Sequence, residues 1–239
     1  MLNVTGVLAV LDRGITINWD DGPTLHRITA LVSYHTAEDT TIQNVRLYAT
    51  MKLSEEPLAF VNEGDLKITW TWLEGNTDNG ADPVFWLVQL AVTNQSDDEV
   101  YLDSLDVIRI DAELGGQFNL GASPDLWRCL REHNGDNADW ESSADTGYLR
   151  EQYLIVQPVT SNRTHPPALL VRVDADQQSD NGQLPVELQL DFSGAHFTLL
   201  AARNRAGSAH LAPGVTVVSS RFVIASGDDA LELKRLQPI

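Results

Sequence analysis

Apolar and polar residues alternate along much of this chain, and apolar residues at helical spacing are almost absent. In residues 66–72 every second position is apolar, and residues 186–192 repeat the pattern. Such alternation places one set of side chains on the buried face of a β-strand. Residues 84–93 are apolar on both faces, which predicts a central strand that is covered by two layers.

About a dozen segments carry strand signals. Besides those three, they are residues 7–11, 15–19, 27–34, 42–53, 100–111, 148–158, 168–173, 196–202 and 215–225. Turn residues at 94–98 are expected to join two long strands as a hairpin, and Ser193-Gly194 a tighter pair, so that adjacent strands run antiparallel. This pattern predicts an all-β fold, a large two-sheet antiparallel sandwich formed by residues 1–239 as a single domain.

Two stretches interrupt the strand pattern. Residues 120–146 are rich in Gly, Asn, Asp and Ser, and they predict a long loop that carries Trp127, Arg128 and Trp140. Residues 226–239 open with a helix-entry signal and predict the start of a short C-terminal helix or of a linker.

The charge balance narrows the choice of partners. The 239 residues include 16 basic and 34 acidic ones, a net charge of −18, which repels phosphate backbones and anionic lipid headgroups. We therefore expect no nucleic-acid partner and no membrane partner. The first residues lack the basic start and long apolar core of a signal peptide, so a cytoplasmic location is expected. The lone Cys129 is expected to be a packed side chain.

Three segments carry a family resemblance. Residues 85–105 contain an apolar strand, a Thr-Asn-x-Ser turn and a Leu-x-x-Leu strand, and Trp127-Arg128 is followed by Trp140. Residues 211–214, then Ser219 or Ser220, precede a closing Ser-Gly-Asp-Asp at 226–229. Together these segments resemble the N-terminal domain of family 36 glycoside hydrolases, the α-galactosidases also called melibiases. The family's Gly-Trp-x-Ser-Trp segment is degraded around Trp140, which leaves its role in a sugar pocket open.

The resemblance implies a β-supersandwich of the galactose-mutarotase-like type, normally followed by a catalytic (β/α)₈ barrel. In that family two aspartates on the barrel perform catalysis, and their motifs have no counterpart in this sequence. The chain would then be the non-catalytic domain alone, with a barrel or a second copy of itself as its partner.

A search for chemistry from the residues agrees with that expectation. Neighbouring carboxylates on strands or turns point apart, and the six histidines show no metal-ligand spacing. We therefore expect no catalytic residue, no metal and no cofactor. Two alternatives remain open: an aldose epimerase on the same fold, using His165 or His196 with a distant glutamate, and a purely structural interaction module.

The tryptophans divide into two groups. Four occupy alternating strand positions and are expected in the core: Trp19, Trp70, Trp72 and Trp86. Trp127 and Trp140 are candidates for stacking on a sugar ring, with Arg128 as a donor to its hydroxyl groups. In the other interpretation both rings fasten the loop to the sandwich. The sequence thus favours a non-catalytic carbohydrate-associated domain that serves oligomer contacts, sugar binding or both.

Overall fold

The fold was described from a computed structural model. It covers residues 6–11, 14–20, 22–49, 52–55, 57–75, 85–133, 137–142, 153–159, 167–174, 184–193, 196–227, 230 and 233. The described strands form two sheets, and within each sheet every pair of neighbouring strands is antiparallel. The predicted all-β two-sheet antiparallel sandwich is confirmed.

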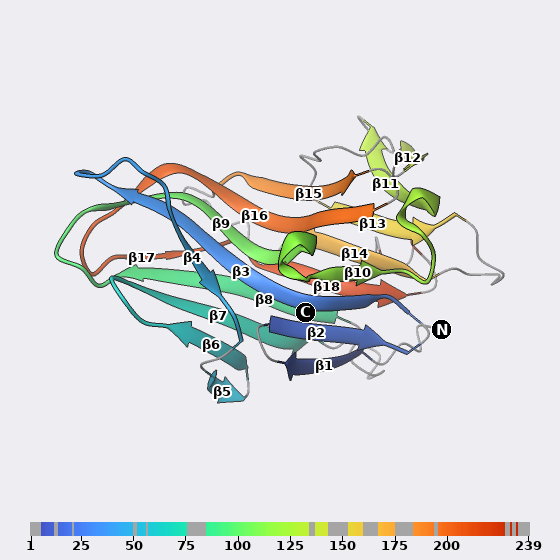
Figure 1. Ribbon diagram of the computed structural model, residues 1–239, viewed down its shortest axis with the longest axis horizontal. Helices are drawn as coiled ribbons and strands as arrows, with labels where there is room; N and C mark the ends of the chain where they lie inside the picture. Colours follow the sequence, from blue (N-terminus) through green and yellow to red (C-terminus); the bar gives the residue numbers. More distant parts are fainter. Residues whose placement is uncertain are drawn as a thin grey trace.

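The first sheet has eight strands in the order β1-β2-β3-β9-β16-β15, with β10 and β4 also pairing with β3. Its three longest strands run side by side across the molecule (Figure 1). Its strands are β1 (Gly6–Leu11), β2 (Gly14–Trp19), β3 (Thr24–Thr36), β4 (Gln43–Leu47), β9 (Val100–Asp111), β10 (Gln117–Asn119), β15 (Val186–Ser193) and β16 (His196–Leu211).

The second sheet has ten strands in the order β12-β11-β13-β14-β18-β8-β7-β6-β5, and β17 pairs with β8. Its strands are β5 (Lys52–Glu55), β6 (Leu58–Asn62), β7 (Leu66–Gly75), β8 (Phe85–Asn94), β11 (Trp127–His133), β12 (Asn137–Ser142), β13 (Tyr153–Pro158), β14 (Ala168–Val173), β17 (Thr216–Val218) and β18 (Phe222–Gly227). The predicted strands over 100–111 and 168–173 coincide with β9 and β14.

One large apolar cluster draws its side chains from both sheets and forms the core of the sandwich. Trp70 and Trp72 are fully buried in it, and Trp19 belongs to it as predicted. A second cluster contains Phe85 and Leu87 of β8, so this strand is buried on two sides, as expected for a central strand. Cys129 is a free, buried cysteine.

One expected hairpin is instead a connection between the sheets. Residues 94–98 link β8 in the ten-stranded sheet to β9 in the eight-stranded sheet, and the two strands do not pair. β14 and β15 likewise lie in different sheets. By contrast, Ser193 pairs with His196, so the predicted tight connection of β15 to β16 is confirmed.

The predicted long loop over residues 120–146 is wrong. Within it, β11 and β12 pair as an antiparallel hairpin at the edge of the ten-stranded sheet, and β11 pairs with β13 on its other side. The polar composition misled the prediction because an edge hairpin tolerates polar residues that a central strand would exclude.

The short helix expected over residues 226–239 is not supported. The described residues contain no helix of seven residues or longer. They contain two three-residue 3₁₀ turns, η1 (Ala112–Leu114) and η2 (Pro124–Leu126). β18 takes up the beginning of that segment. Ala230 and Leu233 are buried in the second apolar cluster, against side chains of β8, β13, β14 and β18.

A β-bulge in β9 decides which of its side chains face outward. Adjacent residues of β16, Ala202 and Arg203, lie opposite Ile108 and Asp106, so Val107 is an extra residue in β9. The pairing of β9 with β3 shifts at the same place. An extra residue moves the alternation of side chains by one position. Asp106 and Arg109 therefore share one face although three positions separate them, and they form an ion pair.

Candidate functional site

Trp127 is buried and is not available as an open stacking surface. It is 1% exposed, and its indole Nε1 donates a hydrogen bond to the carbonyl oxygen of Ala122 at 3.0 Å. Its ring packs against those of Phe118 and Phe192, with centroid distances of 4.7 and 5.8 Å. The aromatic contacts come from β10 and β15, so Trp127 ties the two sheets together. The burial of Trp127 fits the interpretation in which its ring fastens this segment to the sandwich.

Arg128 lies next to Trp127 on β11 and contacts Gln157 of β13. With the Gln157 carboxamide oriented so that its oxygen faces the guanidinium group, that oxygen accepts from Arg128 Nε at 2.9 Å and also from Nη2. Trp140 is the register partner of Leu130 on β12, and its side chain lies outside the described part of the structure. A sugar-binding site formed by Trp127, Arg128 and Trp140 together therefore stays a prediction.

The burial of Trp127 leads to a prediction about stability. The substitution Trp127→Phe keeps a ring in contact with Phe118 but removes the donor to Ala122. We expect the free energy of unfolding to fall by about 1–2 kcal/mol, because a partly buried carbonyl loses its partner. Urea denaturation followed by circular dichroism measures this, with Leu126→Ala, at a 41% exposed neighbour, as a control that stays within about 0.5 kcal/mol. A Trp127→Phe protein as stable as the parent would contradict the tethering role.

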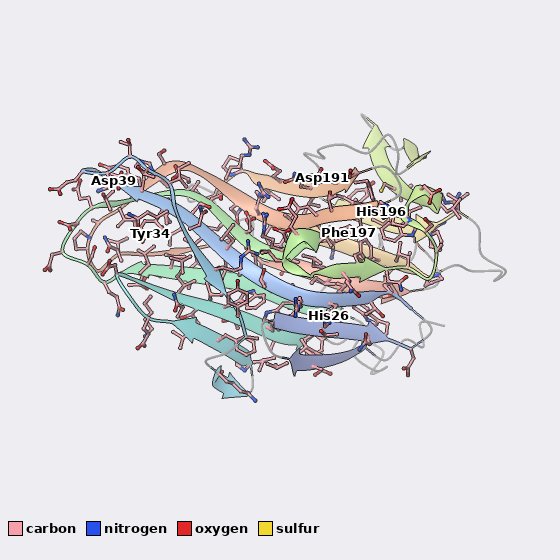
Figure 2. The ribbon with its side chains drawn as sticks, in the orientation of Figure 1. His26, Tyr34, Asp39, Asp191, His196 and Phe197 are labelled. Carbon is pink, nitrogen blue, oxygen red and sulfur yellow. The ribbon has the colours of Figure 1, made fainter. Side chains whose placement is uncertain are left out.

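The epimerase alternative requires a histidine and a carboxylate that face each other across a sugar. His35 Nδ1 instead lies 2.9 Å from Asp103 Oδ2, and His210 Nε2 lies 3.3 Å from Glu99 Oε1, distances that leave no room for a ring between them. His196 is exposed at the start of β16 (Figure 2).

The other histidines add no such pair to the described part of the chain. His26 shares a hydrogen bond with Thr16 Oγ1 at 2.8 Å. His165 lies outside the described residues. The geometry of the described residues gives the epimerase alternative no support.

A network of charged side chains covers the outer face of the eight-stranded sheet. It was not predicted from the sequence. Arg109 Nη2 lies 2.8 Å from Asp111 Oδ2, and Arg109 Nη1 lies 2.8 Å from Asp106 Oδ2. The Arg203 side chain continues the network, 3.1 Å from Asp106 and 3.7 Å from Glu187. From β4 to β15 the members are Arg46, Asp111, Arg109, Asp106, Arg203, Glu187 and Arg205.

This network is electrostatically unusual for the chain. Four guanidinium groups meet three carboxylates on one face of a protein whose net charge is −18. Burial alone would lower the pKa of Arg109, but hydrogen bonds and attraction to Asp111 and Asp106 outweigh it and raise that pKa. Arg109 therefore keeps its charge at physiological pH, and guanidinium groups of this kind can donate hydrogen bonds to anionic or hydroxyl groups.

Two of the segments that carry the family resemblance meet in space. Asn94, from the Thr-Asn-x-Ser turn, is fully buried, and its Nδ2 donates to the carbonyl oxygens of Asp98 at 2.7 Å and Leu211 at 2.9 Å. The backbone N–H of Gly214 donates to the Asn94 carbonyl oxygen at 2.8 Å. One buried amide therefore joins two of the motifs, and its role here is structural.

Two further features of the described residues bear on chemistry. No group of three or more His, Cys, Asp or Glu side chains among them is arranged to hold a metal ion. Asp174 is fully buried and forms an ion pair with Arg221, whose Nε lies 2.6 Å from the Asp174 Oδ2. No helix in the described residues is long and apolar enough to cross a membrane.

Comparison with known proteins places the fold. No protein-family model and no curated protein sequence matches the chain. Among solved structures, it is similar to the GH36 α-galactosidase AgaB from Geobacillus stearothermophilus, with a TM-score of 0.50, 11% identity, and coverage of 84% of this chain and 30% of that one. A variant of AgaA from the same organism, in complex with raffinose, gives a TM-score of 0.53, 10% identity and the same coverages.

A polysaccharide lyase is similar over more of the chain, with a TM-score of 0.54, 9% identity, and coverage of 98% of this chain and 34% of that one. These likenesses show a shared fold. The resemblance read from the sequence is thus confirmed at the level of the sandwich. The chain spans about a third of the length of each of these enzymes.

Proposed function

We propose that this chain is a non-catalytic, carbohydrate-associated domain that works beside a catalytic (β/α)₈ barrel and binds saccharide on the outer face of its eight-stranded sheet. One observation carries the proposal. The same sandwich makes up 30% of α-galactosidases and 34% of a polysaccharide lyase, both named for acting on carbohydrates. In each the remaining two thirds of the chain lie outside the likeness.

The outer face of the eight-stranded sheet has the chemistry for such a role. Guanidinium and carboxylate groups that are held rigidly by one another can donate to and accept from sugar hydroxyl groups at little cost in side-chain entropy. Arg109 and Arg203 are each 17% exposed, so their outer edges reach solvent while their ion pairs hold them in place. Trp127, in contrast, is buried and supplies no open ring.

Binding to the isolated chain tests the proposal. Calorimetric titrations with neutral saccharides such as raffinose, and with acidic oligosaccharides, are expected to show saturable binding of at least one class. Amide shifts in NMR spectra should fall on β4, β9 and β16 rather than on β11 and β12. Lys67→Gln, on β7 of the other sheet, is the matched control and should bind as the parent does. If no saccharide of either class binds, the sugar-binding role is wrong.

The second part of the proposal is that the domain also makes contacts within an oligomer. Light scattering of the purified chain over a wide concentration range measures them directly. A stable dimer or larger assembly supports this part, and a chain that stays monomeric throughout overturns it.

A further inference from the structure

A small pocket lies at one end of the charged network, where β3, β4 and η1 come together. Its lining includes Arg27, Arg46, Tyr48, Asp111 and Leu114, and its volume is about 90 Å³. That is roughly the space of three water molecules, so it fits a substituent of a larger ligand rather than a whole sugar chain.

Arg27 is held in the pocket by an uncommon backbone conformation. Its φ is 55°, in the left-handed region that non-glycine residues seldom adopt. The pairing of β2 with β3 is shifted there, with Ile15 opposite Ile28 and Ile17 opposite Leu25, so β3 contains an extra residue. Bulges of this kind re-aim side chains, and strained backbone is often found at ligand sites.

Neighbouring residues make room for the Arg27 guanidinium and fix its position. Nη1 donates to the carbonyl oxygen of Leu114 at 3.0 Å. A Cβ atom on Gly115 would lie 2.2 Å from that same nitrogen, and the φ of Gly115 is +80°. Glycine at this position therefore lets the guanidinium group cross η1, and the remaining N–H donors of Arg27 have no partner among the described contacts.

Arg46 supplies a second cation to the lining of the pocket. Its Nη1 donates to Thr29 Oγ1 at 3.3 Å, and its Nη2 lies 3.9 Å from Asp111 Oδ2, too far for a hydrogen bond. Asp111 is already paired with Arg109 at 2.8 Å. Two guanidinium groups thus face a pocket whose single carboxylate is neutralised from elsewhere, a combination that favours an incoming anion.

The remaining lining distinguishes a sugar acid from a simple anion. The oxygens of Asp111 can accept hydrogen bonds from hydroxyl groups, which a sugar acid carries and a simple anion lacks. Tyr48 and Leu114 are 39% and 48% exposed and form an apolar rim beside the two arginines. Such a rim suits the C–H face of a pyranose ring.

We propose that this pocket binds the carboxylate of a uronic acid unit in an acidic polysaccharide, with Arg27 and Arg46 on the carboxylate, Asp111 on a ring hydroxyl and Tyr48 against the ring. The proposal rests on the carbohydrate-binding function proposed above and specifies its ligand class and its residues.

The test compares uronic acid oligosaccharides with neutral ones of the same length, by calorimetry on the full chain. We expect the acidic ligand to bind at least tenfold more tightly, and Arg46→Gln to weaken that binding tenfold or more. Lys67→Gln removes the same charge from β7 of the other sheet, away from the pocket, and should leave binding unchanged. Tyr48→Ala, at a partly exposed position, provides a second variant that should fold normally and bind more weakly.

Arg27→Asn separates a binding role from a structural one. Asparagine tolerates a positive φ better than arginine does, so the thermal stability of the variant should stay near that of the parent while acidic oligosaccharide binding is lost. Neutral saccharides that bind as tightly as acidic ones, or acidic binding that survives both Arg27→Asn and Arg46→Gln, would overturn the pocket proposal and leave the general carbohydrate role standing. Failure of every saccharide to bind would overturn both.

Discussion

Replacing Trp70 with alanine is expected to lower the free energy of unfolding by about 4 kcal/mol, the largest single effect that we anticipate in this protein. Trp70 lies on β7 and is fully buried between the two sheets. Its ring contacts those of Phe60 and Trp72, with centroid distances of 5.9 and 5.2 Å. Truncation removes this packing and leaves a cavity, a change that costs about 3–5 kcal/mol for a buried tryptophan.

Trp70 also makes a polar contact that crosses the sandwich. Its Nε1 donates to the carbonyl oxygen of Val107 at 3.0 Å, and Val107 is the extra residue of the bulge in β9. A bulge leaves a backbone group without a ladder partner, and the indole supplies one. Trp70→Phe keeps most of the volume but removes the donor, so we expect a loss of about 1–3 kcal/mol.

Urea or thermal unfolding of Trp70→Ala and Trp70→Phe measures both the stability that packing contributes and the stability that the hydrogen bond contributes. Leu73→Ala, on the same strand but 45% exposed, is the control and should change stability by no more than about 0.5 kcal/mol. A loss below 2 kcal/mol for the alanine variant would mean that the core relaxes around the site, and a fully stable phenylalanine variant would mean that the cross-sheet hydrogen bond contributes nothing.

Replacing Asp106 with alanine is expected to cost about 3–5 kcal/mol, because it removes the carboxylate at the centre of the charged network. Asp106 is 1% exposed and lies between Arg109 and Arg203. Without it, two guanidinium groups that are largely buried face each other with one carboxylate fewer. Arginine side chains stay protonated in any usual pH range, so deprotonation offers no relief.

A double-mutant cycle of Asp106→Ala with Arg203→Ala separates this effect from lost packing. The second substitution should cost much less when Asp106 is already absent. Glu63→Ala, at a 61% exposed carboxylate that lies 3.9 Å from Lys67, is the control and should change stability by less than about 1 kcal/mol. Additive losses in the cycle would show that the network is not coupled.

The sequence by itself determined the class of the fold and most of its strands. Period-two alternation located β7 and β15, because a strand with one buried face must alternate. Continuous apolar character identified β8 as a central strand, because only a strand covered on both faces excludes polar residues. The same patterns placed Trp70 and Trp72 in the core.

Only the tertiary structure decided which sheet each strand joins. Residues 94–98 have the composition of a hairpin turn, but the buried amide of Asn94 directs the chain from one sheet to the other through its bonds to Asp98 and Leu211. Residues 42–53 contain two strands, since β4 pairs with β3 in one sheet and β5 pairs with β6 in the other. Local composition does not determine such long-range pairing.

Sequence patterns likewise could not predict the candidate site. Trp127 was visible as an unusual residue in a polar stretch, but its burial depended on Phe118 and Phe192 from strands of the other sheet. The charged face and its pocket depend on the bulges in β9 and β3, which re-aim Asp106 and Arg27. An extra residue in a strand is defined only relative to its neighbours in the sheet, so the register of the folded sheet alone could place these side chains together.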